Sequence, residues 1–204
     1  LTIRQITDDA AHRRRKDPKL IHSVAVYWLY EYETVPLGVE GSIRVVEESM
    51  ELPLVPFPPL EEVEREREHW AAGLAAALKR QACESEMLVS KRFDYWSKLR
   101  LEATRLGPNP ATVRFSVQVF DFGEMAIVAA PFELMAETGV SLRTASPWPN
   151  TFVLGYSNGL VSYLPTPKVS AEGGMEAKGA YIYDLVPSEI PGDWEPLIKL
   201  EILR

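Results

Sequence analysis

Residues 112–133, TVRFSVQVFDFGEMAIVAAPFE, contain the pattern that decides the fold of this chain. Apolar and polar side chains alternate along its first half, with one parity apolar and the other polar: Val113, Phe115, Val117 and Val119 against Arg114, Ser116 and Gln118. This period of two is typical of a strand with one buried face. Residues 121–123, Asp-Phe-Gly, form a hairpin-like turn, and residues 124–130 supply a partner strand. The pattern predicts an antiparallel strand pair that delivers Glu133 at or just past its end.

The region before this pair predicts strands followed by helices. Residues 43–47 and 50–55 have the composition of strands, and the prolines at 53–59 force an extended exit. Residues 60–106 contain no proline and only one glycine, and apolar side chains recur at helical spacing: Val63, Trp70, Leu74 and Leu78, then Val89, Phe93 and Trp96. We expect two helices joined near residues 83–85, serving as packing material for a sheet.

The region after the pair predicts a helix at residues 133–144 and then short strands between turns. Residues 150–176, NTFVLGYSNGLVSYLPTPKVSAEGGME, combine a β-prone run with turns rich in Gly, Asn and Pro, which are sites where binding groups gather. Turn chemistry alone also allows a pair of ordinary surface turns. Residues 180–183 predict a strand, and a last segment packs on the core through Trp194, Leu197, Ile198 and Leu203. The whole pattern predicts an α+β fold of mixed α/β layers, with a mixed sheet packed by long helices.

Size and composition describe an ordinary globular protein. The chain has 204 residues, of which 46% are hydrophobic and 25% charged, enough for one domain (1–204) or for part of a larger one. Residues 1–42 give no clear assignment, apart from an apolar run at 20–30. The net charge of −7, with one short basic run at 13–16, argues against a nucleic-acid partner. No stretch approaches the roughly 18 apolar residues of a membrane span.

The start of the chain and its single cysteine bear on compartment. Position 1 is leucine and no signal peptide is visible, so we expect the chain to lie inside a longer product. Cys83 alone cannot form an intrachain disulfide, which favours a reducing, cytoplasmic compartment. Secretion stays open, because a leader could precede Leu1.

The residues themselves do not predict a complete metal site. The three histidines, His12, His22 and His69, match neither an HxH nor an HExxH spacing. Nucleophile-elbow, P-loop and dinucleotide motifs are absent from the sequence. A zinc centre built from this chain alone is therefore not supported by motif spacing.

Residues 131–176 resemble a block of the neutral/alkaline ceramidase family, zinc-dependent amidases that cleave the N-acyl bond of the sphingolipid ceramide. The family pattern, roughly NTFxxGYxNxxxxYxPT with a Gly/Tyr/Glu turn after it, is similar to residues 150–176. Residues 131–133, Pro-Phe-Glu, stand where the family has Pro-Gly-Glu. The resemblance extends from about residue 43 to the C-terminus, and it implies the C-terminal half of a ceramidase-like catalytic domain.

The resemblance implies Zn²⁺ as cofactor, with Glu133 and Tyr163 as two of its ligands. A carboxylate is an ordinary zinc ligand, and a metal can lower the pKa of a tyrosine enough for coordination. Two histidine ligands would come from outside this chain, on an upstream half or a second polypeptide. Asn158 and the turn at Gly173 and Gly174 would shape the site for a lipid or small-molecule amide. From the residues alone, Glu133 could instead be a helix-start carboxylate and Tyr163 a packed turn tyrosine.

Two departures from the family pattern motivate alternatives. Phe132 replaces a glycine beside Glu133 and is expected to add bulk near the metal. Met175 stands at a family tyrosine position, where a thioether cannot donate the hydrogen bond of a phenol. The chain could thus be a non-catalytic, ceramidase-like subunit or interaction module, or part of an oligomer. A third reading is a related hydrolase acting on a small non-lipid amide or ester.

Overall fold

The computed structural model describes residues 13–15, 32–34 and 43–204. The chain divides into two compact units, Leu1–Ser42 and Ile43–Arg204. In the first unit, β1 (Arg13–Arg15) and β2 (Tyr32–Thr34) pair antiparallel. The apolar run at residues 20–30, together with His12 and His22, lies outside the described residues. The second unit is described by itself below.

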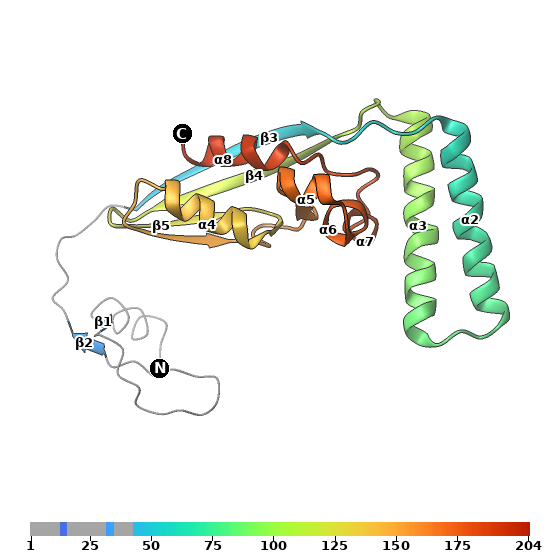
Figure 1. Ribbon diagram of the computed structural model, residues 1–204, viewed down its shortest axis with the longest axis horizontal. Coiled ribbons are helices and arrows are strands. Elements are labelled where there is room, and N and C mark those ends of the chain that lie inside the picture. Colours follow the sequence, from blue (N-terminus) through green and yellow to red (C-terminus); the bar gives the residue numbers. More distant parts are fainter. Residues whose placement is uncertain (1–12, 16–31, 35–42) are drawn as a thin grey trace. The chain divides into compact units, whose positions relative to one another are not determined.

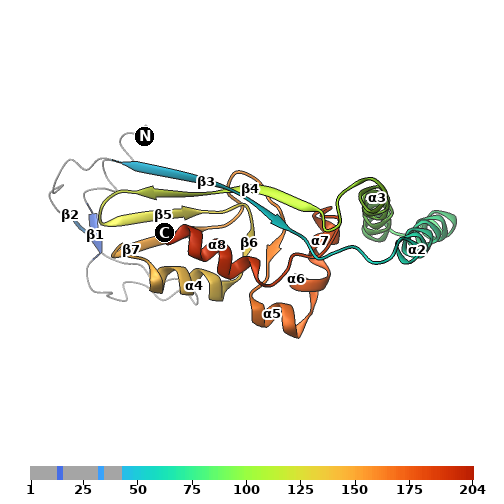
Figure 2. The ribbon, with the colours of Figure 1, turned by 90° about the horizontal axis from the view of Figure 1, so that it is seen from above.

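A four-stranded mixed sheet forms the centre of the second unit, in the order β3-β4-β5-β7 (Figures 1 and 2). The strands are β3 (Arg44–Pro53), β4 (Thr112–Asp121), β5 (Met125–Ala129) and β7 (Asn150–Leu154). β3–β4 and β4–β5 are antiparallel, which confirms the predicted strand pair, and β5–β7 is parallel. The strand structure predicted at 43–47 and 50–55 is confirmed, but the two ranges belong to one strand, because residues 48–50 keep their pairing with β4 without a turn.

Helix α4 (Ala136–Ala145) connects the parallel strands β5 and β7. It begins three residues later than the predicted helix at 133–144. The reason is that Glu133 and Leu134 form β6, a short strand that pairs in parallel with β8 (Tyr163–Leu164). Glu133 is therefore a strand residue, and its reading as a helix-start carboxylate is wrong.

The predicted helix pair is confirmed as α2 (Leu60–Lys79) and α3 (Glu84–Leu106), with Cys83 in the link. Trp96 is fully buried and its indole Nε1 donates to the Val186 carbonyl at 2.7 Å, which holds α3 to the C-terminal region. Leu78 and Val89, predicted to pack, are exposed. Both lie near the linked ends of the helices, which extend away from the other elements of this unit (Figure 1).

The C-terminal region is more helical than predicted, with α5 (Pro167–Glu172), α6 (Met175–Lys178), α7 (Ala180–Tyr183) and α8 (Trp194–Ile202). The strand predicted at residues 180–183 is wrong, since a run of four residues is too short for periodicity to separate strand from helix. In α8, Trp194 and Ile198 are buried as predicted, whereas Leu197 is 45% exposed. Leu197 precedes Ile198 by one position, about 100° round the helix.

The core confirms the parity predicted for β4. Phe115 and Val117 are buried and pack with Phe132, Leu142 of α4 and Trp194 of α8 in one cluster. The structure thus has helices packed on a mixed sheet, an α+β fold as predicted. No helix in the described parts is long and apolar enough to cross a membrane.

Candidate functional site

The parallel strands β5 and β7 end at the same edge of the sheet, where Ala129 pairs with Leu154. In sheets with helical crossovers, ligands bind outside the carboxyl ends of parallel strands. The two segments that leave this edge are bonded to each other. The Tyr156 amide donates to the Phe132 carbonyl at 3.0 Å, and the Ser157 amide donates to the Ala130 carbonyl at 3.1 Å. These backbone hydrogen bonds hold the segments that follow β5 and β7 next to each other.

Glu133 and Tyr163, the two predicted metal ligands, are brought side by side at this edge. They are direct partners in the parallel β6–β8 pair. The Glu133 amide donates to the Ser162 carbonyl at 3.0 Å, and the Val161 amide donates to the Pro131 carbonyl at 2.7 Å. Paired residues of neighbouring strands project from the same face of a sheet. The carboxylate and the phenol consequently face the same space.

A second phenol, that of Tyr156, reaches the same carboxylate. Hydrogen bonding to Glu133 is the main cause that raises the pKa of Tyr156. Hydrogen bonding to Glu133, burial and the Glu133 charge together raise the pKa of Tyr163 to about 12. Both phenols are thus protonated at neutral pH and donate toward one carboxylate. Sequence reasoning missed Tyr156; the signal was its place directly after Gly155, past the end of a strand.

An open crevice of ≈ 470 Å³ lies at this edge, beside α4. Glu133 and Tyr156 line it, and Arg143 of α4 is the single basic residue among its lining residues. No salt bridge within the described residues involves Glu133 or Arg143. The crevice therefore presents a carboxylate that forms no salt bridge with any described residue.

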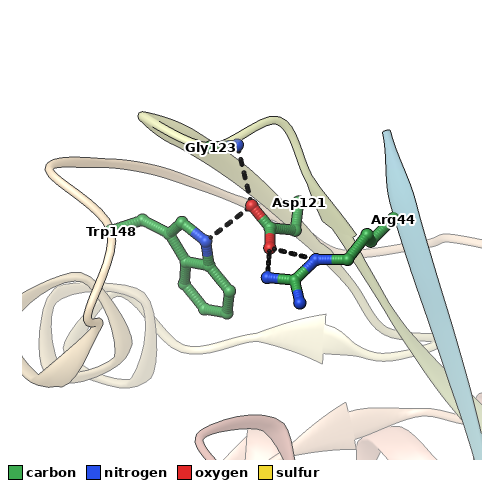
Figure 3. A network of polar contacts seen from close by, with 4 residues as sticks. All are labelled: Arg44, Asp121, Gly123 and Trp148. Carbon is green, nitrogen blue, oxygen red and sulfur yellow. Dashed lines mark hydrogen bonds and ion pairs between the residues drawn. The ribbon is translucent and has the colours of Figure 1, made fainter. Parts of the chain in front are cut away.

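The opposite end of β5 holds a carboxylate of a different kind, Asp121 (Figure 3). Its Oδ1 accepts from the Gly123 amide at 2.8 Å and from the Trp148 indole at 2.9 Å, and its Oδ2 accepts from Arg44 Nε at 3.1 Å. The Gly123 bond, the Arg44 bond and then the Trp148 bond lower the pKa of Asp121. This carboxylate has no oxygen left for a ligand, and its role is structural.

Phe132 does not crowd the crevice, which corrects the expectation of bulk near a metal. Its side chain is fully buried and meets Phe115 edge to face, with ring centroids 4.9 Å apart. Neighbouring strand residues point to opposite faces, so Phe132 enters the core while Glu133 faces the crevice.

The Gly173-Gly174 turn joins α5 to α6, and both glycines have positive φ angles, +79° and +97°. Neither residue lines the crevice. Met175, which follows them, is half exposed at the start of α6. The turn is nevertheless close to Tyr163, because the charge of Glu176 contributes to the raised pKa of that phenol. A role of Gly173 and Gly174 in substrate binding stays a prediction.

Asn158 lies apart from the Glu133 crevice. Its Nδ2 donates to Gln118 Oε1 of β4 at 2.7 Å. It lines another cavity, of ≈ 350 Å³, together with Ser116 and Pro131. The structure therefore does not bring Asn158 together with Glu133 and Tyr163, and its substrate-binding role stays a prediction.

The oxygen donors at this edge do not by themselves make up a metal site. Within residues 13–15, 32–34 and 43–204, no group of three or more His, Cys, Asp or Glu side chains could hold a metal ion. His69 is on α2 and packs against Trp70, with ring centroids 4.9 Å apart. Glu133 and Tyr163 fit a cation as two oxygen donors, since a cation bound to both would replace the phenol proton. The remaining donors would have to lie outside the described residues.

Comparison with known proteins gives weak similarities. No family model matches the chain, and no curated protein matches it. One similar solved structure is a ceramidase complexed with C2, at 18% identity and a TM-score of 0.37, covering 44% of this chain and 14% of that one. Another is the neutral ceramidase from Pseudomonas aeruginosa, at 19% identity and a TM-score of 0.36, covering 47% and 15%. The chain thus spans about one seventh of the length of these structures.

Proposed function

We propose that this chain contributes Glu133 and Tyr163 as metal ligands to a zinc-dependent hydrolase that cleaves a C–N amide bond, resembling neutral ceramidase. One observation carries the proposal. The Glu133 carboxylate, which has no salt-bridge partner among the described residues, has the phenols of Tyr156 and Tyr163 beside it at the carboxyl edge of parallel strands, and Glu133 and Tyr156 line an open crevice there. The sequence resemblance at residues 131–176 supplies the identity of the metal and of the reaction.

The charge at this edge suits a divalent cation. The hydrogen-bond donors beside the Glu133 carboxylate among the described residues are two neutral phenols, which leave its charge available to a cation. Binding of a cation to the Tyr163 oxygen requires the phenol to lose its proton. Because ligand protons are released on binding, the affinity for the metal should rise with pH. The Phe132 side chain, turned into the core, leaves the crevice side of Glu133 free.

The chemistry of a bound zinc ion would be to polarise the amide carbonyl and to lower the pKa of a water molecule. The residues of this chain hold the ion and shape the space beside it. Arg143 places a positive charge on the crevice wall, where it can attract a polar or anionic part of the substrate. Two histidine ligands would come from an upstream half of the same protein or from a second polypeptide. The substrate would be a lipid or small-molecule amide.

Hydrolysis by the complete natural protein tests the proposal. We expect cleavage of an N-acyl amide to stop in a chelator and to return with added zinc. Glu133→Gln should lower kcat/KM by more than about 100-fold, because a direct ligand matters at least as much as the residues that orient it. Glu137→Gln, on the exposed first turn of α4, is the matched control and should retain activity. Unchanged hydrolysis in Glu133→Gln would refute the proposal.

A non-catalytic, ceramidase-like subunit or interaction module is the second candidate. It is favoured by the lack, among the described residues, of any group of three or more His, Cys, Asp or Glu side chains that could hold a metal ion, and by Met175 at the family tyrosine position. The zinc content of the complete protein separates the two candidates. About one zinc per chain supports the hydrolase, and a protein that never takes up zinc supports the module.

A further inference from the structure

Tyr156 occupies a backbone conformation that tyrosine rarely adopts. Its φ angle is +53°, in the left-handed region that favours glycine or asparagine. The conformation is fixed on both sides. The Tyr156 amide donates to the Phe132 carbonyl at 3.0 Å, and Gly155 approaches so closely that an added Cβ would lie 2.6 Å from the same oxygen. Non-glycine residues held in such conformations cluster at functional sites.

Neither packing nor backbone preference explains a tyrosine at this position. The side chain is 58% exposed, so its ring contributes little to the core. A glycine or an asparagine would satisfy the backbone with less strain. Tyr156 and Glu133 line the same crevice, and what only the tyrosine supplies there is a hydroxyl group beside the Glu133 carboxylate.

The two phenols approach Glu133 from different elements. Tyr163 belongs to β8 and is the direct partner of Glu133, whereas Tyr156 follows β7. An ionised carboxylate can accept several hydrogen bonds on its two oxygens. If Tyr163 gives its proton up to bind a cation, Tyr156 is the donor that stays on Glu133. The terminal torsion of a glutamate is otherwise broad, so this bond selects the carboxylate orientation.

We propose that Tyr156 is a positioning residue for the metal site: its hydroxyl holds the Glu133 carboxylate in the orientation that binds the ion beside Tyr163. This inference rests on the proposed function. Hydrogen-bond partners of metal-ligating carboxylates typically change metal affinity or activity by about 10- to 100-fold when removed.

The test is zinc affinity of the complete natural protein, measured by competition with a chromogenic chelator. Tyr156→Phe removes only the hydroxyl and should weaken zinc binding by about 10- to 100-fold. The thermal unfolding of the zinc-free protein should stay unchanged. Saturating zinc should restore kcat, with KM unaltered throughout, a recovery that a merely structural defect would not show. Tyr95→Phe, an exposed tyrosine of α3, is the matched control.

The outcomes separate this inference from the proposed function. Wild-type zinc affinity in Tyr156→Phe, together with loss of affinity in Glu133→Gln, overturns the positioning role and leaves the hydrolase intact. Wild-type affinity in both variants overturns the metal site itself. Weakened binding in Tyr156→Phe accompanied by a lower unfolding temperature without zinc also overturns the positioning role, because the hydroxyl would then act on stability.

Discussion

Asp121, the last residue of β4, and Glu133, in β6, lie beyond opposite ends of strand β5 and have different surroundings. Asp121 accepts from a guanidinium, an indole and a backbone amide, so that its charge and both oxygens are satisfied (Figure 3). Glu133 meets two phenols and no cation of the described chain. The Asp121 carboxylate links the segments at its end of the sheet, whereas the Glu133 carboxylate forms no salt bridge within the part of the chain that the structure describes.

The difference shows how a structural carboxylate can be told from a candidate ligand. Charge-assisted bonds to Arg and N–H donors lower a carboxyl pKa and use up the oxygen lone pairs. Neutral phenols keep a carboxylate in place without neutralising it. Such an environment has room for one more partner, and that partner would be a cation.

Among the variants that test this difference between Asp121 and Glu133, Tyr163→Phe is expected to have the largest effect on zinc affinity. Removing the phenol oxygen should lower zinc affinity by more than about 100-fold, since a direct donor is lost. Because the pKa of Tyr163 is about 12 without metal, zinc must displace its proton at any lower pH. Wild-type affinity should therefore gain about one extra factor of ten per pH unit relative to the variant. Zinc titrations at several pH values around neutrality measure both effects. If the zinc affinity of wild type and variant rose equally with pH, Tyr163 would not be a ligand.

Asp121→Asn should give the next largest effect, and on stability rather than on metal binding. The pKa of Asp121 is lowered in the folded protein, so its stabilisation is present above the unfolded pKa and is lost as pH falls through the folded pKa. The variant should melt at a lower temperature at neutral pH and approach the wild type in acid. Thermal unfolding against pH checks this, while zinc affinity of the folded variant should be unchanged. A parallel offset at every pH would contradict it.

Gly155→Ala tests whether the close backbone approach of Gly155 to Phe132 is needed to position Tyr156 beside Glu133. The new Cβ would lie 2.6 Å from the Phe132 carbonyl oxygen, so the end of β7 must move. We expect a loss of roughly 1–3 kcal/mol in the free energy of unfolding, typical of overpacking. Zinc binding should also weaken, because Tyr156 would move with its neighbour. A variant as stable as the wild type in chemical denaturation would show that the close approach is not needed.

Gly73→Ala, in α2, serves as the control variant and is expected to have the smallest effect on stability and zinc affinity. Gly73 lies inside α2 and an added Cβ would meet nothing within 4 Å. The change should stabilise the protein by about 0.5–1 kcal/mol, because alanine favours the helix and restricts the unfolded chain. Chemical denaturation measures it. Zinc affinity should remain that of the wild type, and a change there would link the helix pair to the site.

Most of the fold could be predicted, because its signals are local. The alternation in residues 113–119 predicted the central strand, and the apolar spacing of residues 60–106 predicted the helix pair. The four residues of α7 were mistaken for a strand, since so short a run has no readable period. β6 and β8, of two residues each, are likewise below what periodicity can detect.

The site was predictable only in part. Glu133 and Tyr163 were named through a motif resemblance, and their juxtaposition depends on a strand pairing that no sequence pattern indicates. Tyr156 was missed because its partner becomes visible only when two loop segments meet. Asp121 was read as a turn residue, since its partners Arg44 and Trp148 are 77 and 27 positions away in the sequence. Contacts between distant segments are set by the tertiary fold.

The most direct test is an anomalous diffraction map at the zinc edge from crystals of the complete natural protein grown with zinc. The account predicts a peak about 2.0–2.2 Å from a Glu133 carboxylate oxygen, the distance of a zinc–oxygen bond, with the Tyr163 oxygen also bound. The Tyr156 hydroxyl should remain hydrogen-bonded to Glu133. A map without a peak at Glu133, or with zinc bound only elsewhere, would contradict the account.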